Sequence, residues 1–209
     1  MQKLVNLMSV PTPSGRLYET DLRLRPDGAG GLLVSSIEGF AGYQRERAWA
    51  WEHQALVRAR AIAGAESVMQ TFEHTRAQTL CLPRNADKVV ADVRQMRQRM
   101  RAELDRSGPG RFDLKHGEGG LVDLEFALQA AVLAHAARFP ALARPRSSGE
   151  LIDALSTVGI WDSVCAEGAH QAHGCLLARS LECTLDCRPR VLPLTDELAR
   201  SRQQVRAAT

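Results

Sequence analysis

The most chemically suggestive stretch of the sequence is Leu17–Pro26, which reads Leu-Tyr-Glu-Thr-Asp-Leu-Arg-Leu-Arg-Pro. Side chains of a strand alternate between two faces, so this stretch would separate apolar from charged groups. The charged face would carry Glu19, Asp21, Arg23 and Arg25. Carboxylates beside guanidinium groups on a rigid strand could hold a metal ion and a phosphate together. On a solvated sheet face, the same residues would form ordinary cross-strand ion pairs.

The residues that follow predict a β-hairpin. Pro26 ends the first strand because it has no N–H to donate, and the glycine-rich stretch 27–31 can turn the chain. Leu32–Val34 can then return as a second strand. Two strands are too few to be stable alone. We therefore expect the hairpin to belong to a larger sheet, most of which lies outside this chain.

A second candidate group lies in the segment 112–126. Its members are Lys115, Gly119, Gly120, Asp123 and Glu125. A glycine pair at the start of a helix lets backbone N–H groups approach an anion, and Lys115 adds a mobile positive charge. Asp123 and Glu125 are two residues apart, so on a helix they diverge. Asp123 either faces a catalytic cleft or caps the helix, where its charge suits the positive end of the dipole.

Two further clusters have simpler interpretations. Trp49 and Trp51 are expected to be packing anchors near the start of a helix. His53 is expected to be a surface or partly buried residue and no metal ligand. The nearby Arg58 and Arg60 either reach a cleft or form structural ion pairs.

Arginines recur at helical spacing further along the chain, at Arg94, Arg97 and Arg101. This stripe could meet an acidic partner or nucleic acid. We expect a solvated face instead, because the acidic residues Asp92 and Glu103 dilute its charge.

The elements that must position these groups are mostly helices. Ser36 is a suitable N-cap, and apolar residues at helical spacing follow through most of the remaining chain. Helices are predicted over residues 1–9, 48–63, 65–79, 85–107, 121–137, 150–157, 161–186 and 196–207. The expected fold is mainly α, a helical bundle preceded by a remnant β-hairpin. We expect residues 1–35 and 36–209 to belong to different domains.

Composition excludes some classes of protein. The 209 residues carry a net charge of +3, which requires no polyanionic partner, and no apolar run is long enough to cross a membrane. The sequence predicts a cytoplasmic protein that binds neither membrane nor nucleic acid. Its five cysteines form no Cys-x-x-Cys pair, so we expect reduced thiols and no zinc site.

Three blocks resemble one known family. The blocks Tyr18–Pro26, Trp49–Arg60 and Phe112–Phe126 match the glutamine-synthetase adenylyltransferases in the order and at the intervals that this family shows. The resemblance is strong over residues 1–135 and weaker beyond. The block at 51–60, Ala29 after the turn glycine and the tail Ser201–Arg206 look more like the adenylylating half of these two-part enzymes than like the companion half.

The resemblance implies a nucleotidyltransferase fold of the polymerase-β type. In such enzymes, two carboxylates of an Asp-x-Asp strand and a third from a neighbouring strand hold two Mg²⁺ ions against ATP. Asp21 matches the third carboxylate, as a metal ligand and possible acceptor of the attacking hydroxyl's proton. Arg23 and Arg25 would clamp phosphates, or else pair with neighbouring carboxylates. The group at 115–125 would line the same cleft.

The resemblance also implies a reaction and partners. AMP would pass from ATP to a tyrosine of glutamine synthetase, and the companion half would remove it by phosphorolysis. A PII signalling protein and glutamine would set the balance. No Gly-Ser turn and Asp-x-Asp strand precede Asp21, so we expect a C-terminal fragment that is inactive alone. The alternative is a helical docking or regulatory module that binds glutamine synthetase, PII or the companion half.

Overall fold

The chain folds mainly into α-helices, as the sequence predicts. The computed structural model describes residues 1–15, 20–22 and 24–209. Their helices are α1 (Gln2–Ser9), α2 (Ile37–Glu46), α3 (Ala50–Arg58), α4 (Glu66–Leu80), α5 (Ala86–Leu104), α6 (Leu121–His135), α7 (Ser148–Thr157), α8 (Ser163–Leu185) and α9 (Asp196–Ala207). Within this part of the chain, no helix combines the length and the hydropathy that crossing a bilayer needs.

Several helices begin where the sequence provides a side-chain cap. Ser36, Asn85 and Asp162 each accept a hydrogen bond from a backbone N–H in the first turn of the helix that follows. Ser147 and Glu150 form a reciprocal capping box at α7. Such caps satisfy N–H groups that have no partner within the helix, and each contributes about 1 kcal/mol.

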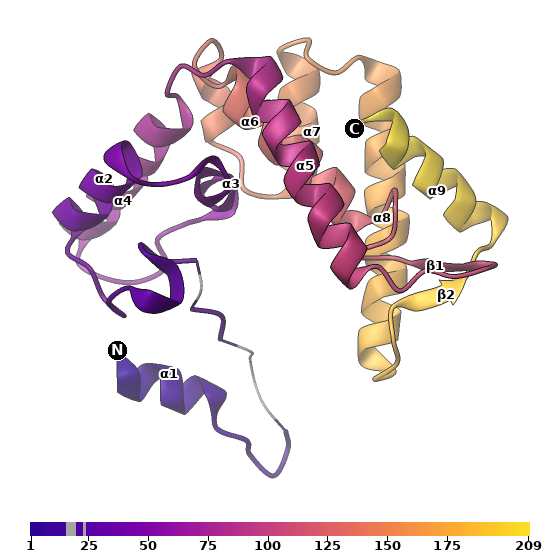
Figure 1. Cartoon of the computed structure of the whole chain (residues 1–209), viewed down its shortest axis with the longest axis horizontal. Helices are drawn as coiled ribbons and strands as arrows, with labels where there is room; N and C mark the ends of the chain where they lie inside the picture. The colour runs from indigo at the N-terminus through magenta and orange to yellow at the C-terminus, as the bar shows by residue number, and fades with distance from the viewer. Residues whose placement is uncertain (16–19, 23) are drawn as a thin grey trace.

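Helix α6 is the centre of the bundle. It contacts α3, α5, α7, α8 and α9, and Figure 1 shows it between α2–α4 on one side and α8–α9 on the other. Leu124, Leu128, Val132 and Leu133 are almost completely buried. A fully buried side chain of this kind stabilises the fold by about 1.5–3 kcal/mol. Apolar packing around α6 therefore fixes the positions of the helices that carry the candidate site.

The predicted hairpin at 17–34 is not present in the described residues. Residues 20–22 and 24–34 contain no strand, and the turn region forms a short 3₁₀-helix, η1 (Gly28–Gly30). The guanidinium group of Arg25 donates to the carbonyl oxygens of Leu22 (2.5 Å) and Gly31 (3.4 Å) within the same segment. Residues 16–19 and 23, which would form part of the first strand, lie outside the described residues. Without a sheet beside it, a pair of strands has little to stabilise it.

The sheet in the described part of the chain lies elsewhere. Strands β1 (Arg111–Asp113) and β2 (Val191–Pro193) pair antiparallel, with Phe112 opposite Leu192. This pairing joins two segments that lie far apart in the sequence. It ties the segment before α6 to the segment before α9, so α9 is held close to the glycine-rich loop 117–120.

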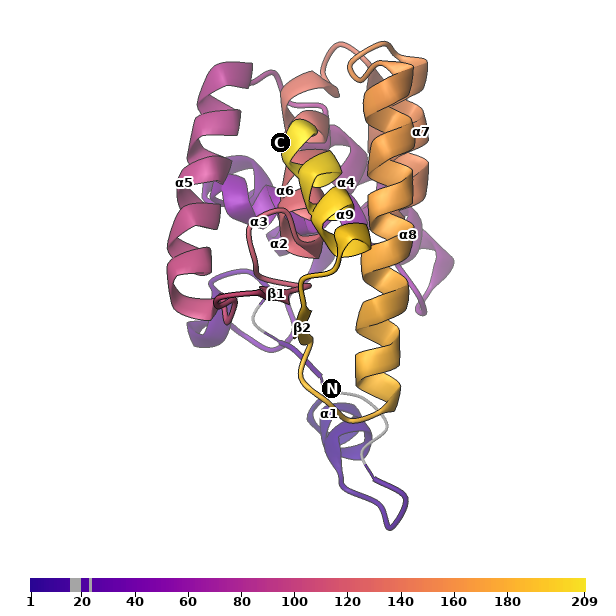
Figure 2. The same ribbon diagram turned by 90° about the vertical axis from the view of Figure 1, so that its right-hand side faces the viewer.

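The N-terminal segment is much less packed than the helical part. None of the described residues among 1–35 is buried, and α1 lies apart from the bundle in both views (Figures 1 and 2). Exposed apolar side chains accumulate there, at Leu4, Leu7, Leu24, Leu32 and Val34. The structure thus shows a well-packed helical part and an N-terminal segment without a core.

Candidate functional site

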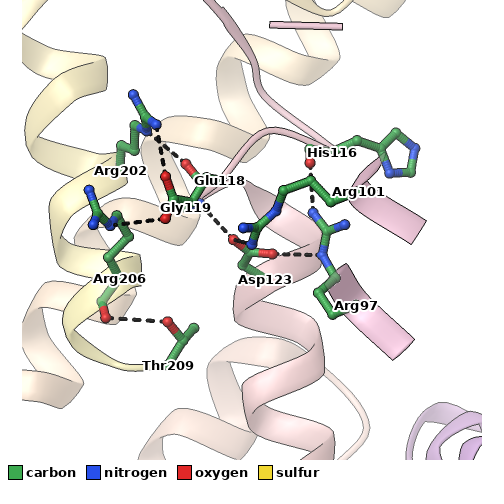
Figure 3. Close-up of polar contacts among 9 residues, drawn as sticks. All are labelled: Arg97, Arg101, His116, Glu118, Gly119, Asp123, Arg202, Arg206 and Thr209. Carbon is green, nitrogen blue, oxygen red and sulfur yellow. Dashed lines mark hydrogen bonds and ion pairs between the residues drawn. The ribbon is translucent and has the colours of Figure 1, made fainter. Parts of the chain in front are cut away.

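Asp123, in the first turn of α6, is a buried carboxylate with charged partners on α5. Its carboxylate forms ion pairs with Nε of Arg97 at 2.6 Å and with Nη2 of Arg101 at 2.7 Å (Figure 3). It also accepts a hydrogen bond of 2.6 Å from the N–H of Gly119. A negative charge at this position is stabilised by the helix dipole. Asp123 therefore anchors the start of α6, and it also lines a cavity between α5 and α6.

The prediction of a solvated arginine stripe on α5 is wrong for Arg97. Its side chain is 5% exposed, and burial lowers its pKa while the Asp123 carboxylate opposes that shift. The signal was present in the sequence, because Val89, Val93 and Arg97 continue one seam at four-residue spacing. Burial of the Arg97 guanidinium group is compensated by the carboxylate that faces it. Arg94 is exposed, as expected, and Arg101 is half-buried.

The glycine-rich loop is shaped by close packing. Gly119 has a φ of +79°, and a Cβ atom there would lie 2.5 Å from the carbonyl oxygen of Arg202 on α9. A Cβ on Gly120 would meet three backbone carbonyl oxygens at 2.9–3.1 Å. Both positions therefore require glycine for steric reasons, independently of any ligand.

The backbone N–H groups of this loop already have partners within the chain. The N–H of Gly119 donates to Asp123, and those of residues 120, 121, 122 and 123 donate to carbonyl oxygens of residues 117, 114, 115 and 120. An anion bound there, as the glycine pair predicts, would have to displace these bonds. Lys115 is exposed, so its side chain remains available to a ligand.

Helix α9 closes over this loop through Glu118. The guanidinium group of Arg202 donates to the Glu118 carbonyl oxygen at 2.8 Å and to its carboxylate at 3.2 Å, and Arg206 lies 3.6 Å from the same carboxylate (Figure 3). Arg202 also stacks over the ring of Phe112, 5.5 Å from its centroid. These contacts link α9 to the segment that leads into α6.

Glu125 points to the opposite side of α6, as its spacing from Asp123 predicts. Its carboxylate pairs with Arg58 of α3 at 2.5 Å. Arg58 also lines a cavity of about 430 Å³ between the segment 24–26 and helices α2, α3 and α4. Arg25, Phe40 and Phe72 share that lining. The sequence left open whether Arg58 reaches a cleft or forms a structural ion pair. In the structure it forms an ion pair and also lines a cavity.

The structure divides the predicted site residues into two places. Arg25 lies at the cavity, and Glu125 is joined to it through Arg58. Gly119, Gly120 and Asp123 lie where α6 begins, among contacts with α5 and α9. Asp21 is exposed, and Arg23 lies outside the described residues.

The described residues do not assemble a magnesium site by themselves. Mg²⁺ requires six oxygen ligands, usually from one or two carboxylates together with phosphates and water. Among the residues that the structure describes, no group of three or more His, Cys, Asp or Glu side chains could hold a metal ion.

Two buried polar residues were not predicted from the sequence. Arg76 of α4 donates to the carbonyl oxygens of Leu56, Val57 and Ala143, and burial lowers its pKa to about 10. Asp113 accepts hydrogen bonds from three backbone N–H groups, that of Arg106 before β1 and those of Lys115 and His116 after it. The position of Asp113 inside the block 112–126 could have identified it as a candidate residue. For Arg76 nothing local distinguishes a buried arginine from an exposed one.

The tryptophan prediction is wrong within this chain. Trp49 is 70% exposed and Trp51 is 39% exposed, so neither is a core anchor. Both tryptophan rings instead add to the exposed apolar surface. His53, in contrast, is buried: its Nε2 bonds the carbonyl oxygen of Gln44, and its Nδ1 lies 3.0 Å from Nη2 of Arg84.

Comparisons with known proteins find similarity to one kind of enzyme, the glutamine synthetase adenylyltransferases. A family model described as Glutamate-ammonia ligase adenylyltransferase matches residues 1–75. A bifunctional glutamine synthetase adenylyltransferase/adenylyl-removing enzyme from Stenotrophomonas maltophilia (strain K279a) is 52% identical over 207 residues, which is 99% of this chain. Nearly the whole chain is thus similar to one part of a bifunctional glutamine synthetase adenylyltransferase/adenylyl-removing enzyme. A relative with the same description from Xanthomonas campestris pv. campestris (strain B100) is 50% identical over 206 residues.

The chain corresponds to only part of these relatives. It spans 22% of the length of the Stenotrophomonas enzyme. A second family model, described as GlnD PII-uridylyltransferase, matches residues 90–186. The first model thus covers Asp21, Arg25 and Arg58, and the second covers Arg97 to Glu125. Both halves of the candidate site therefore lie in regions that resemble nucleotidyltransferases.

Proposed function

We propose that this chain is part of an enzyme that transfers AMP from ATP to a tyrosine of glutamine synthetase. The observation that carries this proposal is the 52% identity over 99% of the chain to a bifunctional adenylyltransferase/adenylyl-removing enzyme. The tyrosine hydroxyl oxygen would attack the α-phosphorus of ATP and form a new P–O bond. The bond from the α-phosphorus to the oxygen that bridges it to the β-phosphorus would break, and pyrophosphate would leave. The hydroxyl proton would pass to a carboxylate, for which Asp21 is our candidate.

Other residues of the chain would bind the phosphates. Arg25 and Arg58 border one cavity, and the planar guanidinium fork suits phosphate oxygens. Arg23 and the exposed Lys115 are further candidates, and the loop at Gly119 and Gly120 would approach a phosphate only by exchanging its internal hydrogen bonds. Mg²⁺ would bring ATP and Asp21 together, with its remaining protein ligands supplied by the longer enzyme.

We further propose that the chain is inactive alone and works in the cytoplasm within a longer, two-part protein. The described residues assemble no metal site, which supports inactivity of the isolated chain. The companion half would remove AMP by phosphorolysis, and a PII protein would regulate the balance. The five cysteines are free, in keeping with a reducing compartment.

A chimera tests the proposal. This chain replaces the matching residues of the Stenotrophomonas relative, and transfer of radiolabelled AMP from ATP to glutamine synthetase is measured. We expect activity in the chimera, a loss of at least 100-fold on Asp21→Asn, and little change on Asp27→Asn. Asp27 is a matched control because its segment and exposure are similar and it pairs with the exposed Arg47 at 3.5 Å. Full activity of Asp21→Asn would refute the role of Asp21.

A second candidate function is docking, and one observation favours it. Leu177, Leu181 and Leu185 recur every four residues along α8 and are 40%, 53% and 83% exposed. An exposed apolar stripe on one helix face is typical of a protein–protein contact. If the chain docks glutamine synthetase or PII, calorimetry should detect binding to the isolated chain, and Leu181→Glu should abolish it. If Leu181→Glu leaves binding unchanged, the leucine stripe is not the binding surface.

A further inference from the structure

A second cavity, of about 320 Å³, lies beside the Asp123 network and away from the cavity at Arg58. Helices α5 and α6 form its two walls, with contributions from the turn before α8 and from the end of α9. Its apolar lining includes Val93, Phe126, Ala127, Ala131, Ile160 and Trp161. The alanines on α6 leave the space open, because larger side chains at those positions would fill it.

The charged side chains of this cavity are unbalanced. Arg94, Arg97 and Arg101 of α5 line it, and the acidic side chain in the same lining is Asp123. The Asp123 carboxylate is already shared between Arg97 and Arg101. Arg94 donates to the backbone oxygen of Thr209. Arg97 and Arg101 therefore carry two positive charges against the single carboxylate of Asp123.

The hydrogen-bond donors are unbalanced as well. The side chain of Arg97 is only 5% exposed, and its Nη1 has no acceptor among the described residues. Nε of Arg101 is also shielded from water without an acceptor there. Buried donors of charged groups that lack acceptors are costly, so native proteins rarely leave them unmatched. Both donors belong to residues that line the cavity and share its one side-chain carboxylate, so the chain leaves them unmatched next to this space.

We propose that this cavity binds a small organic carboxylate whose body is apolar or aromatic. The carboxylate would lie against Arg101 and Arg97, where a guanidinium fork can bind two oxygens at once. The body would lie between Phe126, Ala131 and Trp161. A pocket of a few hundred Å³ with apolar walls and a few polar groups at one end is typical of sites for small molecules. This inference is independent of the proposed adenylyl transfer.

The direct test is titration calorimetry of the intact chain with 3-phenylpropionate, using the neutral 3-phenylpropanamide as the matched ligand. We expect saturable binding at a single site for the acid and binding at least tenfold weaker for the amide. Equal affinities would show that the guanidinium groups do not recognise the charge, and would overturn the proposal.

Variants locate the binding. Ala131→Phe fills the cavity without removing a charge, and Arg101→Gln removes a cation; each should weaken binding of 3-phenylpropionate at least tenfold. Arg188→Gln is the control, because Arg188 pairs with the exposed Asp186 outside this cavity. Thermal unfolding of each variant shows whether it is folded. If Arg101→Gln fails to fold, Ala131→Phe decides alone. Unchanged binding in folded Ala131→Phe would refute the site.

Discussion

Residues 1–35 and the helical part from residue 36 differ in how they use charge. The N-terminal segment carries the motif that resembles a catalytic strand, yet none of its described residues is buried and its apolar side chains are exposed. The helical part buries Asp123 and Arg97 together and shields Arg76 among backbone carbonyl oxygens. Among the described residues, buried charged side chains therefore occur in the helical part and none occurs before residue 36.

The largest effect is expected from Asp123→Ala in the helical part. Removing this carboxylate leaves Arg97 buried and unpaired, which typically costs about 3–5 kcal/mol of unfolding free energy. Urea unfolding followed by circular dichroism measures the loss. Asp186→Ala is the matched control, since the exposed pair of Asp186 and Arg188 should contribute less than about 1 kcal/mol. Equal losses in the two variants would contradict the role given to Asp123.

A smaller loss is expected from Gly119→Ala. The positive φ of Gly119 costs a residue with a Cβ about 1–3 kcal/mol, and the overlap with the Arg202 carbonyl oxygen adds to that. Gly174→Ala should have the opposite sign, because Gly174 lies within α8 and a Cβ there meets no atom within 4 Å. It should stabilise the chain by about 0.5–1 kcal/mol. Thermal unfolding of both variants checks the signs.

Acid should destabilise the helical part through His53. Burial, with a further contribution from Arg84, lowers the pKa of His53, so the folded state favours the neutral ring. Because the pKa of His53 is lower in the folded state than in the unfolded state, the neutral ring stabilises the fold at pH values above the unfolded pKa of about 6.5. This stabilisation is lost as the pH falls from there through the folded pKa. Unfolding free energies measured from pH 7.5 to 5 should therefore fall. His53→Gln should flatten this dependence, although burial also lowers the pKa values of His116 and His173.

The smallest effect is expected from deleting residues 1–34. Their described side chains are exposed or half-buried, so the unfolding free energy of the remaining helices should change by less than about 1 kcal/mol. Urea unfolding of the shortened chain tests this. A loss of several kcal/mol would show that the N-terminal segment is an integral part of the helical fold.

Local signals predicted much of the fold. Ser36 and Asn85 cap the helices expected after them, and apolar spacing located α4, α5 and α6 to within a few residues. The two-residue separation of Asp123 and Glu125 correctly predicted that they diverge. These features depend on interactions within one or two helical turns.

The features that the sequence did not predict depend on distant partners. The burial of Arg97 depends on Asp123, 26 positions later, and that of Arg76 depends on carbonyl oxygens from α3 and from Ala143. The hairpin prediction assumed a sheet that the described residues do not contain. The tryptophan prediction assumed a core that does not reach Trp49. Residue type and spacing cannot specify such partners.

Hydrogen exchange of the isolated chain and of the chimera with the Stenotrophomonas relative tests the central claim most directly. We expect the backbone amides of residues 24–34 to exchange rapidly in the isolated chain. In the chimera, which supplies the rest of the proposed catalytic domain, the same amides should be protected. The amides of α6 should be protected in both. Equal protection of residues 24–34 in the two proteins would contradict the claim that this segment completes a nucleotidyltransferase domain.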